Sequence, residues 1–437
     1  MKDAEFSSPY IKVLNDPVGS FARIRDTVRQ ADNALFLLCT GSTKTSDCEG
    51  ISAAGASPGD RRLTPALDAE ALLAGRTFSS ESLPVSPDGI ASPVVISRAL
   101  VQHLEMQSLV VDAGCFASPA VDCLRFANSP AQCLSTGAAM ERASVESLFE
   151  KGIELGKHLS LKHDFLVLAE CVPAGTTTAL AVLKALGYEV DGMTSSSLPT
   201  TNHDQKLDLV RSGLAKSGFG TSDFIADPLL ALAAVGDPVQ ASLAGIVIGA
   251  SQRIPILMGG GSQMLAIWAV VQRLNEAKRF GVAHENLFVL TTKWVGFDPS
   301  AAVGKLASLL GAPLAVACPE FKNSKHVGLR AYEDGHVKEG AGAGAALCLA
   351  FMKEPSHSLV MQTIDAEYDR LFNQVNGTES RALFEAPSMF AKDGSLSAPD
   401  AILAHGSFAP QHSLNTDFRH QPAIRSADLF GVSNRYI

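Results

Sequence analysis

The sequence lacks the features of a nucleic-acid-binding or membrane protein. Asp and Glu outnumber Lys and Arg by 45 to 36 among the 437 residues, so the formal net charge is -9. There is no run of basic residues and no interleaving of basic with aromatic residues, which argues against nucleic-acid binding. Gly, Ser and Gln interrupt the apolar stretches before any reaches the ~20 residues that a spanning helix needs. The first 16 residues hold no apolar segment of signal-peptide length, so we expect a cytoplasmic protein.

Signatures of metal and nucleotide binding are missing as well. The eight cysteines are scattered, with no Cys-x-x-Cys pair and no Cys and His at zinc spacing. Cys115, Cys123 and Cys133 are loosely clustered, but reduced thiols are a simpler account of them than metal ligands. No Gly-x-x-x-x-Gly-Lys-Ser/Thr motif occurs, which disfavours a nucleotide-dependent kinase or ligase. We therefore predict neither a metal nor a cofactor.

The composition changes near residue 373. Before this point the chain is that of an ordinary globular protein, and hydrophobic residues make up 46% of the whole sequence. After it the chain is rich in Ser, Pro, Asn and His and shows little periodicity. We predict one domain over residues 1–371 and a C-terminal extension over residues 372–437, partly ordered at best and of unknown role.

Residues 164–187 have the clearest local pattern. Residues 165–169 form a short apolar run typical of a buried strand, and Glu170 stands at its C-terminal end. Residues 171–175 contain Pro and Gly and predict a turn, after which Thr176 is a plausible N-cap of a helix. A helix that starts in this way can bind an anion through its free backbone amides. Capping of this helix is the alternative role for Glu170.

The same order of strand, turn and helix returns along the chain. Apolar strands are predicted at residues 34–39, 109–112, 254–258, 287–291 and 313–318, and residues 259–262 form a glycine turn before another helix. This alternation predicts a mostly parallel sheet with helices on both faces. In such α/β folds the ligand lies outside the C-terminal ends of the strands. Glu170, the glycine turn and the region of residues 318–342 should therefore surround one opening.

Residues 321–344 bring basic and small residues together. Lys325 lies beside Asn323 and Ser324, and Glu339 precedes a glycine-rich string that leads into a helix. The alternative interpretation is that the small residues after Glu339 only allow close packing of a helix.

Five segments resemble one protein family. They are GISAAGASPGDRRLTPALDAE at 50–70, ECVPAGTTTALAVLKALG at 170–187, AAVGDPVQASLAGIVIGAS at 233–251, ILMGGGSQMLA at 256–266 and GLRAYEDGHVKEGAGAGAA at 328–346. They look like the archaeal and cyanobacterial branch related to nicotinate-nucleotide–dimethylbenzimidazole phosphoribosyltransferase, over about residues 10–371. The resemblance implies a three-layer α/β fold, a homodimer and transfer of ribose 5-phosphate from nicotinate mononucleotide to a benzimidazole-type base. The products would be nicotinate and the α-ribazole 5-phosphate used for the lower ligand of cobamides.

The resemblance also implies site residues. Glu170, ahead of Thr176 and Thr177, matches the glutamate of a Gly-Glu-Met-Gly-Ile-Gly-Asn-Thr-Thr segment in the bacterial branch. Glu339 matches the base in Gly-Glu-Gly-Ser/Thr-Gly-Ala. Residues 172–175 depart from the bacterial loop, and Thr176 replaces its Asn.

The reaction needs one carboxylate to remove the N–H proton of the incoming azole and cationic or amide donors for the phosphate. We predict Glu339 as this base, with a helix cap as its alternative role, and Glu170 as a group that orients the base or ribose. Lys325, Asn323 and Ser324, together with the backbone amides after Gly175, should hold the phosphate, with a solvated surface lysine as the alternative role of Lys325. A non-catalytic protein that binds the nucleotide or a base remains the alternative function. The predicted substrate-binding residues are Gly175, Thr176, Thr177, Gly260, Gly261, Ser262, Asn323, Ser324, Lys325, Gly340 and Gly342.

Overall fold

The computed structural model describes residues 8–354 and 356–375, and its centre is one sheet of eight strands. The strands are β1 (Ile11–Asn15), β2 (Ala34–Thr40), β3 (Gln107–Asp112), β4 (Leu124–Arg125), β5 (Phe165–Cys171), β6 (Ile256–Gly259), β7 (Leu287–Thr292) and β8 (Leu314–Ala317). Their order in the sheet is β1-β8-β7-β6-β5-β2-β3-β4. Only β1 runs antiparallel to its neighbour, so the predicted mostly parallel α/β sheet is confirmed.

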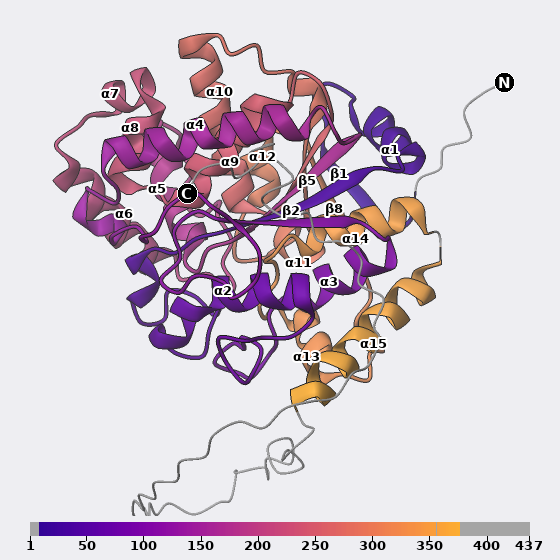
Figure 1. Ribbon diagram of the computed structural model, residues 1–437. Helices are drawn as coiled ribbons and strands as arrows, with labels where there is room; N and C mark the ends of the chain where they lie inside the picture. Colours follow the sequence, from indigo (N-terminus) through magenta and orange to yellow (C-terminus); the bar gives the residue numbers. More distant parts are fainter. Residues whose placement is uncertain (1–7, 355, 376–437) are drawn as a thin grey trace, which may run out of the picture.

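Helices cover both faces of the sheet (Figure 1). The longer ones are α1 (Phe21–Gln30), α2 (Pro58–Ala74), α3 (Val94–His103), α4 (Arg142–Leu159), α5 (Gly175–Ala185), α6 (His203–Ser217), α8 (Pro228–Val235), α9 (Pro238–Ala250), α10 (Ser262–Lys278), α12 (Val303–Leu310), α14 (Ala343–Lys353) and α15 (His357–Val375). Short helices α7 (Thr221–Ala226), α11 (Lys293–Gly296) and α13 (Val327–Arg330) join them. Among the residues described, no helix combines the length and apolar character needed to span a membrane.

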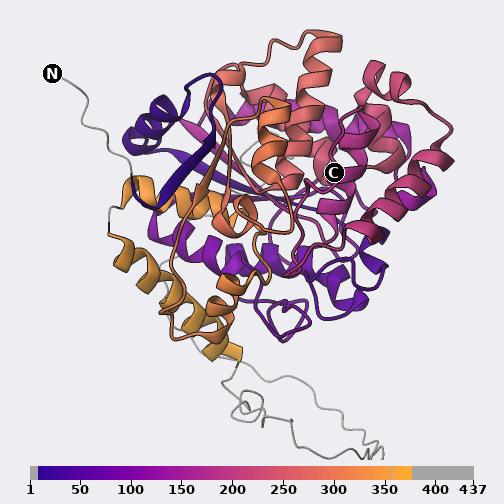
Figure 2. The same cartoon turned by 180° about the vertical axis from the view of Figure 1, so that it is seen from behind.

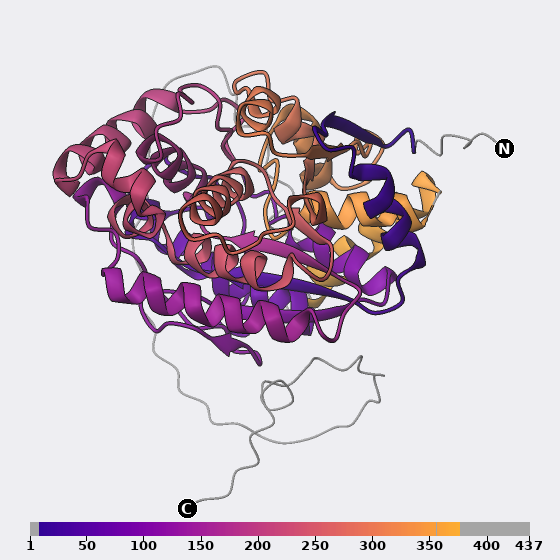
Figure 3. The same ribbon diagram turned by 90° about the horizontal axis from the view of Figure 1, so that it is seen from above.

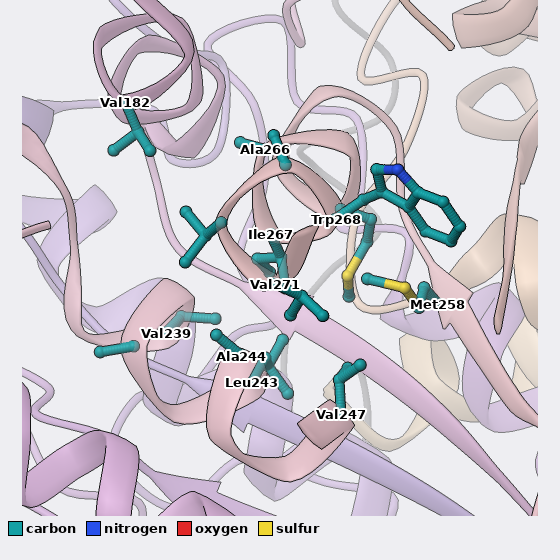
Figure 4. Close-up of a cluster of buried hydrophobic side chains, with 14 of the residues drawn as sticks. Val182, Val239, Leu243, Ala244, Val247, Met258, Ala266, Ile267, Trp268 and Val271 are labelled. Atoms are coloured by element: carbon teal, nitrogen blue, oxygen red, sulfur yellow. The ribbon is translucent and has the colours of Figure 1, made fainter. Parts of the chain in front are cut away.

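Alternation along the strands divides the core into two clusters. In β2, Leu35 and Leu37 belong to the cluster under α4, α5, α9 and α10, whereas Phe36 and Leu38 belong to the cluster under α2, α3 and α14. Both faces of the strand are buried, which explains its continuous apolar run. Figure 4 shows the first cluster, where Leu243 and Val247 of α9 lie near Val271 of α10.

The two clusters are the apolar interiors of the two helical layers, so the three-layer architecture holds. Strand β1 and helix α1 lie at one end of the molecule, and α6 to α8 lie at the other (Figures 1 and 3). Side chains that follow one another at the end of a strand therefore reach different layers.

Helix α15 crosses the predicted domain boundary at residue 372. It continues to Val375 and lies on the outside of the layer that contains α3 (Figure 2). Its buried side chains Val360, Ile364, Tyr368 and Leu371 belong to the second core cluster. Arg98 of α3 bonds to Glu367 at 2.9 Å between Nε and Oε1. The domain therefore includes all of α15, and residues 376–437 of the predicted extension lie outside the described residues.

We predict that a chain ending at Val375 keeps a cooperative thermal transition, whereas one ending at Ser356 does not. The shorter chain loses four buried apolar side chains, each worth roughly 1.5–3 kcal/mol of burial. Calorimetry of both truncated chains beside the full-length protein measures the difference. Equal transitions in the two truncated chains would show that α15 does not belong to the folded unit.

Candidate active site

A pocket opens at the C-terminal ends of β5 and β6 and beside the start of α11. Its wall includes Glu170, Gly175, Thr176, Gly261, Ser262, Glu339 and Gly340 from the predicted site. The predicted residues Thr177, Gly260 and Gly342 lie within two residues of the wall in the chain but are not part of the wall themselves. The sheet therefore brings both predicted glutamates and most of the predicted small residues to one place.

Glu170 lies at the end of β5, and its backbone carbonyl accepts a hydrogen bond from the Ala341 amide at 3.0 Å. This bond ties the segment that carries Glu339 to the central strand. Burial raises the pKa of Glu170 to about 8, and the nearby carboxyl groups of Asp237 and Glu339 contribute to the rise. The Val172 amide offsets only part of it. At neutral pH, Glu170 is therefore mainly a neutral carboxylic acid that can donate a hydrogen bond.

Glu339 is held by four donors. Its Oε2 accepts from the Thr291 hydroxyl at 2.9 Å and the Thr292 amide at 3.0 Å, and its Oε1 accepts from the amides of Gly340 and Gly344 at 3.2 and 3.0 Å. Burial raises the pKa of Glu339 to about 7, although these four bonds oppose the rise. A carboxyl group that is fixed in direction and titrates near neutral pH has the properties of a general base.

The chain around Glu339 adopts an unusual backbone conformation. Val337, Lys338 and Ala341 have φ of +62°, +58° and +48°, which costs non-glycine residues about 1–3 kcal/mol each. Polar contacts hold this segment in place: the Ser97 hydroxyl donates to the Ala341 carbonyl at 2.7 Å, and the Thr292 hydroxyl donates to the Lys338 carbonyl at 2.7 Å.

Gly344 completes this arrangement. A Cβ at Gly344 would lie 2.5 Å from Glu339 Oε2, so glycine is required for the close approach of the carboxylate to the start of α14.

Helix α5 begins two residues earlier than predicted. Ala174, with φ of +67°, is its N-cap, and Thr176 lies in the first turn. In this turn the amides of Gly175 and Thr177 donate to the carbonyls of Val172 and Ala174, both at 2.9 Å, and Gly175 and Thr176 line the pocket wall.

Lys206 is a buried lysine behind the pocket wall that the sequence analysis did not single out. It lies at the start of α6 and is fully buried. Its Nζ donates to the Ser195 carbonyl at 2.8 Å, the Thr194 hydroxyl at 3.1 Å and the Thr176 hydroxyl at 3.3 Å. All three partners are neutral, and burial together with the charge of Lys338 lowers the pKa of Lys206 to about 7. An ammonium group beside the start of α5, without a carboxylate bonded to it, is suited to an anion.

Lys338, the second buried lysine of the site, has a different partner. Its Nζ bonds to Asp298 Oδ2 at 2.6 Å. Burial opposes ionisation of Asp298, but the bonds from Lys338, Ser195 and Ser300 prevail and hold its pKa below the ordinary value. This ion pair fixes the segment before Glu339, whereas the hydrogen-bond partners of Lys206 are all neutral.

The structure does not bring Asn323, Ser324 and Lys325 to the pocket. Lys325 is 59% exposed and forms an ion pair with Asp369, while the Ser324 hydroxyl donates to Asp365 at 2.6 Å. Asn323 is exposed. These contacts hold the basic loop against α15, so the expected phosphate role of Lys325 is corrected in favour of a surface ion pair.

The raised pKa values of the two glutamates make stability depend on pH. A carboxyl group whose folded pKa exceeds its unfolded value of about 4.5 stabilises the fold fully below that value, and the contribution is lost as pH rises through the folded pKa. For Glu170 this window runs from about 4.5 to about 8. We predict that Glu170→Gln reduces the fall in the free energy of unfolding between pH 5.5 and 8.5, measured by urea denaturation. The exposed Glu150→Gln should follow the wild type, and equal slopes for all three proteins would contradict the assignment.

Comparison with known proteins identifies relatives of this chain. A family model described as "Phosphoribosyltransferase" matches residues 91–285. A UPF0284 protein of Gloeobacter violaceus is 44% identical over 336 residues, which are 77% of this chain and 88% of that protein. A UPF0284 protein of Synechocystis sp. is 40% identical over 347 residues, covering 78% and 92% of the two chains.

Solved structures support the fold. A nicotinate-nucleotide-dimethylbenzimidazole phosphoribosyltransferase from Thermus thermophilus superposes with a TM-score of 0.51 at 15% identity, covering 80% of this chain and 88% of that one. A structure named CobT from the same organism gives the same TM-score and identity and covers 92% of that chain. Together with the cyanobacterial relatives, these matches confirm the predicted resemblance. The chain belongs to the UPF0284 family, and its fold is similar to that of a nicotinate-nucleotide-dimethylbenzimidazole phosphoribosyltransferase.

Proposed function

We propose that this phosphoribosyltransferase-type protein moves ribose 5-phosphate from nicotinate mononucleotide to a benzimidazole-type base. The products are nicotinate and α-ribazole 5-phosphate, the precursor of the lower ligand of cobamides. The observation that carries the proposal is the pairing of two buried carboxyl groups of raised pKa, Glu170 and Glu339, in one pocket with a buried lysine nearby. A homodimer is proposed from the family resemblance alone.

We assign binding of the 5-phosphate to Lys206 and the start of α5. Thr176 lines the pocket and its hydroxyl accepts a hydrogen bond from Lys206, so the start of α5 and the ammonium group lie together. A phosphate dianion would supply the charge that the neutral partners of Lys206 do not provide, and would raise the lowered pKa of the lysine again. Lys325 is outside this arrangement, because it bonds to Asp369 of α15.

We assign the role of proton acceptor to Glu339. In the transfer, the lone pair of one azole nitrogen forms a bond to C1′ of the ribose, and the bond from C1′ to the pyridinium nitrogen breaks. The electron pair leaves with nicotinate, whose ring becomes neutral and needs no acid. The N–H proton of the azole passes to the Glu339 carboxylate, which the four donors hold in position. Glu170, mainly protonated at neutral pH, orients the base or ribose by donating a hydrogen bond.

Incubation with nicotinate mononucleotide and a panel of benzimidazoles, followed by mass spectrometry, tests the function. We expect the mass of the ribotide and release of nicotinate. Glu339→Gln should lower turnover by ~100-fold or more and change nucleotide affinity little, because the amide keeps the size but not the basicity of the carboxylate.

Glu170→Gln is the comparison, since an amide still donates a hydrogen bond in place of the neutral acid. If Glu339→Gln keeps near-normal turnover and Glu170→Gln does not, the two roles are exchanged. Tight binding of nucleotide or base without any ribotide would instead indicate a non-catalytic binding protein.

A second prediction concerns the phosphate. Lys206→Met keeps an unbranched side chain in a buried site but removes the charge, and it should raise the KM for nicotinate mononucleotide about tenfold or more, ~1.4 kcal/mol. Lys325→Ala is the matched control and should leave this KM unchanged. With nicotinate riboside, which has no phosphate, Lys206→Met should resemble the wild type. A KM increase for Lys325→Ala but not for Lys206→Met would indicate that the surface loop around Lys325 binds the phosphate instead.

A further inference from the structure

Residues 84–92 form a hairpin between α2 and α3 at the pocket wall. The hairpin contributes five residues to this wall, namely Pro84, Val85, Ser86, Ile90 and Ser92. The Ser86 amide donates to the Ile90 carbonyl at 2.8 Å, and the Ser92 amide donates to the Pro84 carbonyl at 2.9 Å. The Ser86 hydroxyl accepts from the amides of Asp88 and Ile90, both at 3.2 Å. Because these bonds lie within the hairpin, it can move as one unit without breaking them.

Polar contacts join the hairpin to the rest of the domain at its base and at its tip. At the base, Ser92 bonds to Asp68 and to the first turn of α3. At the tip, Asp88 Oδ2 lies 3.1 Å from His336 Nδ1, and the two side chains form an ion pair when the imidazole is protonated. No other hydrogen bond or ion pair links residues 84–92 to another segment in the part of the chain that the structure describes. The Asp88 side chain is 61% exposed, so this fastening is weak.

Other segments of the pocket wall are tied to one another through their backbones. The Ser197 hydroxyl accepts from the Ala53 amide at 2.8 Å, and the Ser197 carbonyl accepts from the Val337 amide at 2.9 Å. The Ser195 amide donates to the Ser262 hydroxyl at 3.0 Å. We call residues 52–55, 195–197 and 337–340 the fixed frame. The hairpin tip joins this frame through His336, the neighbour of Val337.

Residues 80–82 give the hairpin a place to turn. Glu70 holds the chain as far as Ser79 by accepting from its amide and hydroxyl. Glu81 and Ser82, which follow, are exposed. Ile90 is 6% exposed and packs in the second core cluster, so moving the hairpin outward would expose apolar surface. The closed position is therefore the favoured one, and an open position would be a minor state.

We propose that residues 84–92 are a lid, which opens to admit the substrates and closes over them with Asp88 fastened to His336. The inference rests on the proposed function, because it gives this hairpin a step in that reaction. Closure keeps water away from C1′ of the ribose during the transfer. If water attacks C1′ in place of the azole, the bond to the pyridinium nitrogen breaks and the water loses a proton to solvent. The products are then ribose 5-phosphate and nicotinate, so a loosened lid should increase hydrolysis relative to transfer.

Amide hydrogen exchange of the full-length protein, read by mass spectrometry, tests the lid. In the free protein residues 84–92 should exchange faster than the fixed frame, and nicotinate mononucleotide or dimethylbenzimidazole should slow them by about threefold or more. Asp88→Asn keeps the size of the side chain but removes its charge. It should speed exchange of the hairpin by about two- to fivefold, the range for an exposed ion pair, and raise the ratio of ribose 5-phosphate to ribotide. Asp88→Lys, which sets an ammonium group opposite the imidazole, should change both readouts further.

Asp369→Asn is the matched control, because Asp369 is also paired with a histidine, His326 at 3.4 Å, but lies outside the pocket wall. It should leave both readouts unchanged. The proposal would be overturned if the hairpin exchanged as slowly as the fixed frame, if neither Asp88 variant altered the readouts, or if Asp369→Asn altered them equally. Protection of the hairpin by substrates without any ribotide would contradict only the proposed function. Ribotide formation without such protection would contradict only the lid, and absence of both would contradict both.

Discussion

The exclusion of water from carboxyl groups at one edge of the sheet is the condition on which this site depends. Glu170 and Glu339 would behave as ordinary surface glutamates in water, and neither would then be matched to proton transfer near neutral pH. The parallel strands supply this condition because both their faces are covered, so that a side chain at a strand end is already screened by two helical layers. The same screening leaves Lys206 with a lowered pKa.

The segment before α14 shows how the fold maintains the geometry. Three residues with left-handed φ would not persist in an isolated loop, and their combined cost is of the order of several kcal/mol. Hydrogen bonds to β5, β7 and α3 and the Lys338–Asp298 ion pair offset this cost. Since the contacts come from several separate elements of the fold, the position of Glu339 depends on the assembled domain rather than on its own segment.

The sequence was sufficient for the parts of the site that follow from local pattern. The apolar run before Glu170 and the glycines around Glu339 predicted a strand end and a helix start, and both occur. The sequence was insufficient for charged residues whose role depends on whether the folded domain buries the side chain. Lys206 looks like any helical lysine, and only the hydroxyl-rich segment before it indicated a polar environment. Lys325 has a similar local appearance, yet α15 gives it a carboxylate partner on the surface. The predicted boundary at residue 372 was drawn from a change in composition, which does not coincide with the end of α15 at Val375.

The buried ammonium group of Lys206 also bears on how the protein is handled. Under the proposed phosphate assignment, any small tetrahedral oxyanion that reaches the start of α5 would bind to Lys206 as well as the phosphate of a nucleotide. Sulfate or phosphate in a purification buffer would then compete with the substrate and make the purified protein look both more heat-resistant and less active. The ionic composition of the sample therefore becomes an experimental variable, and chloride media are the appropriate reference state.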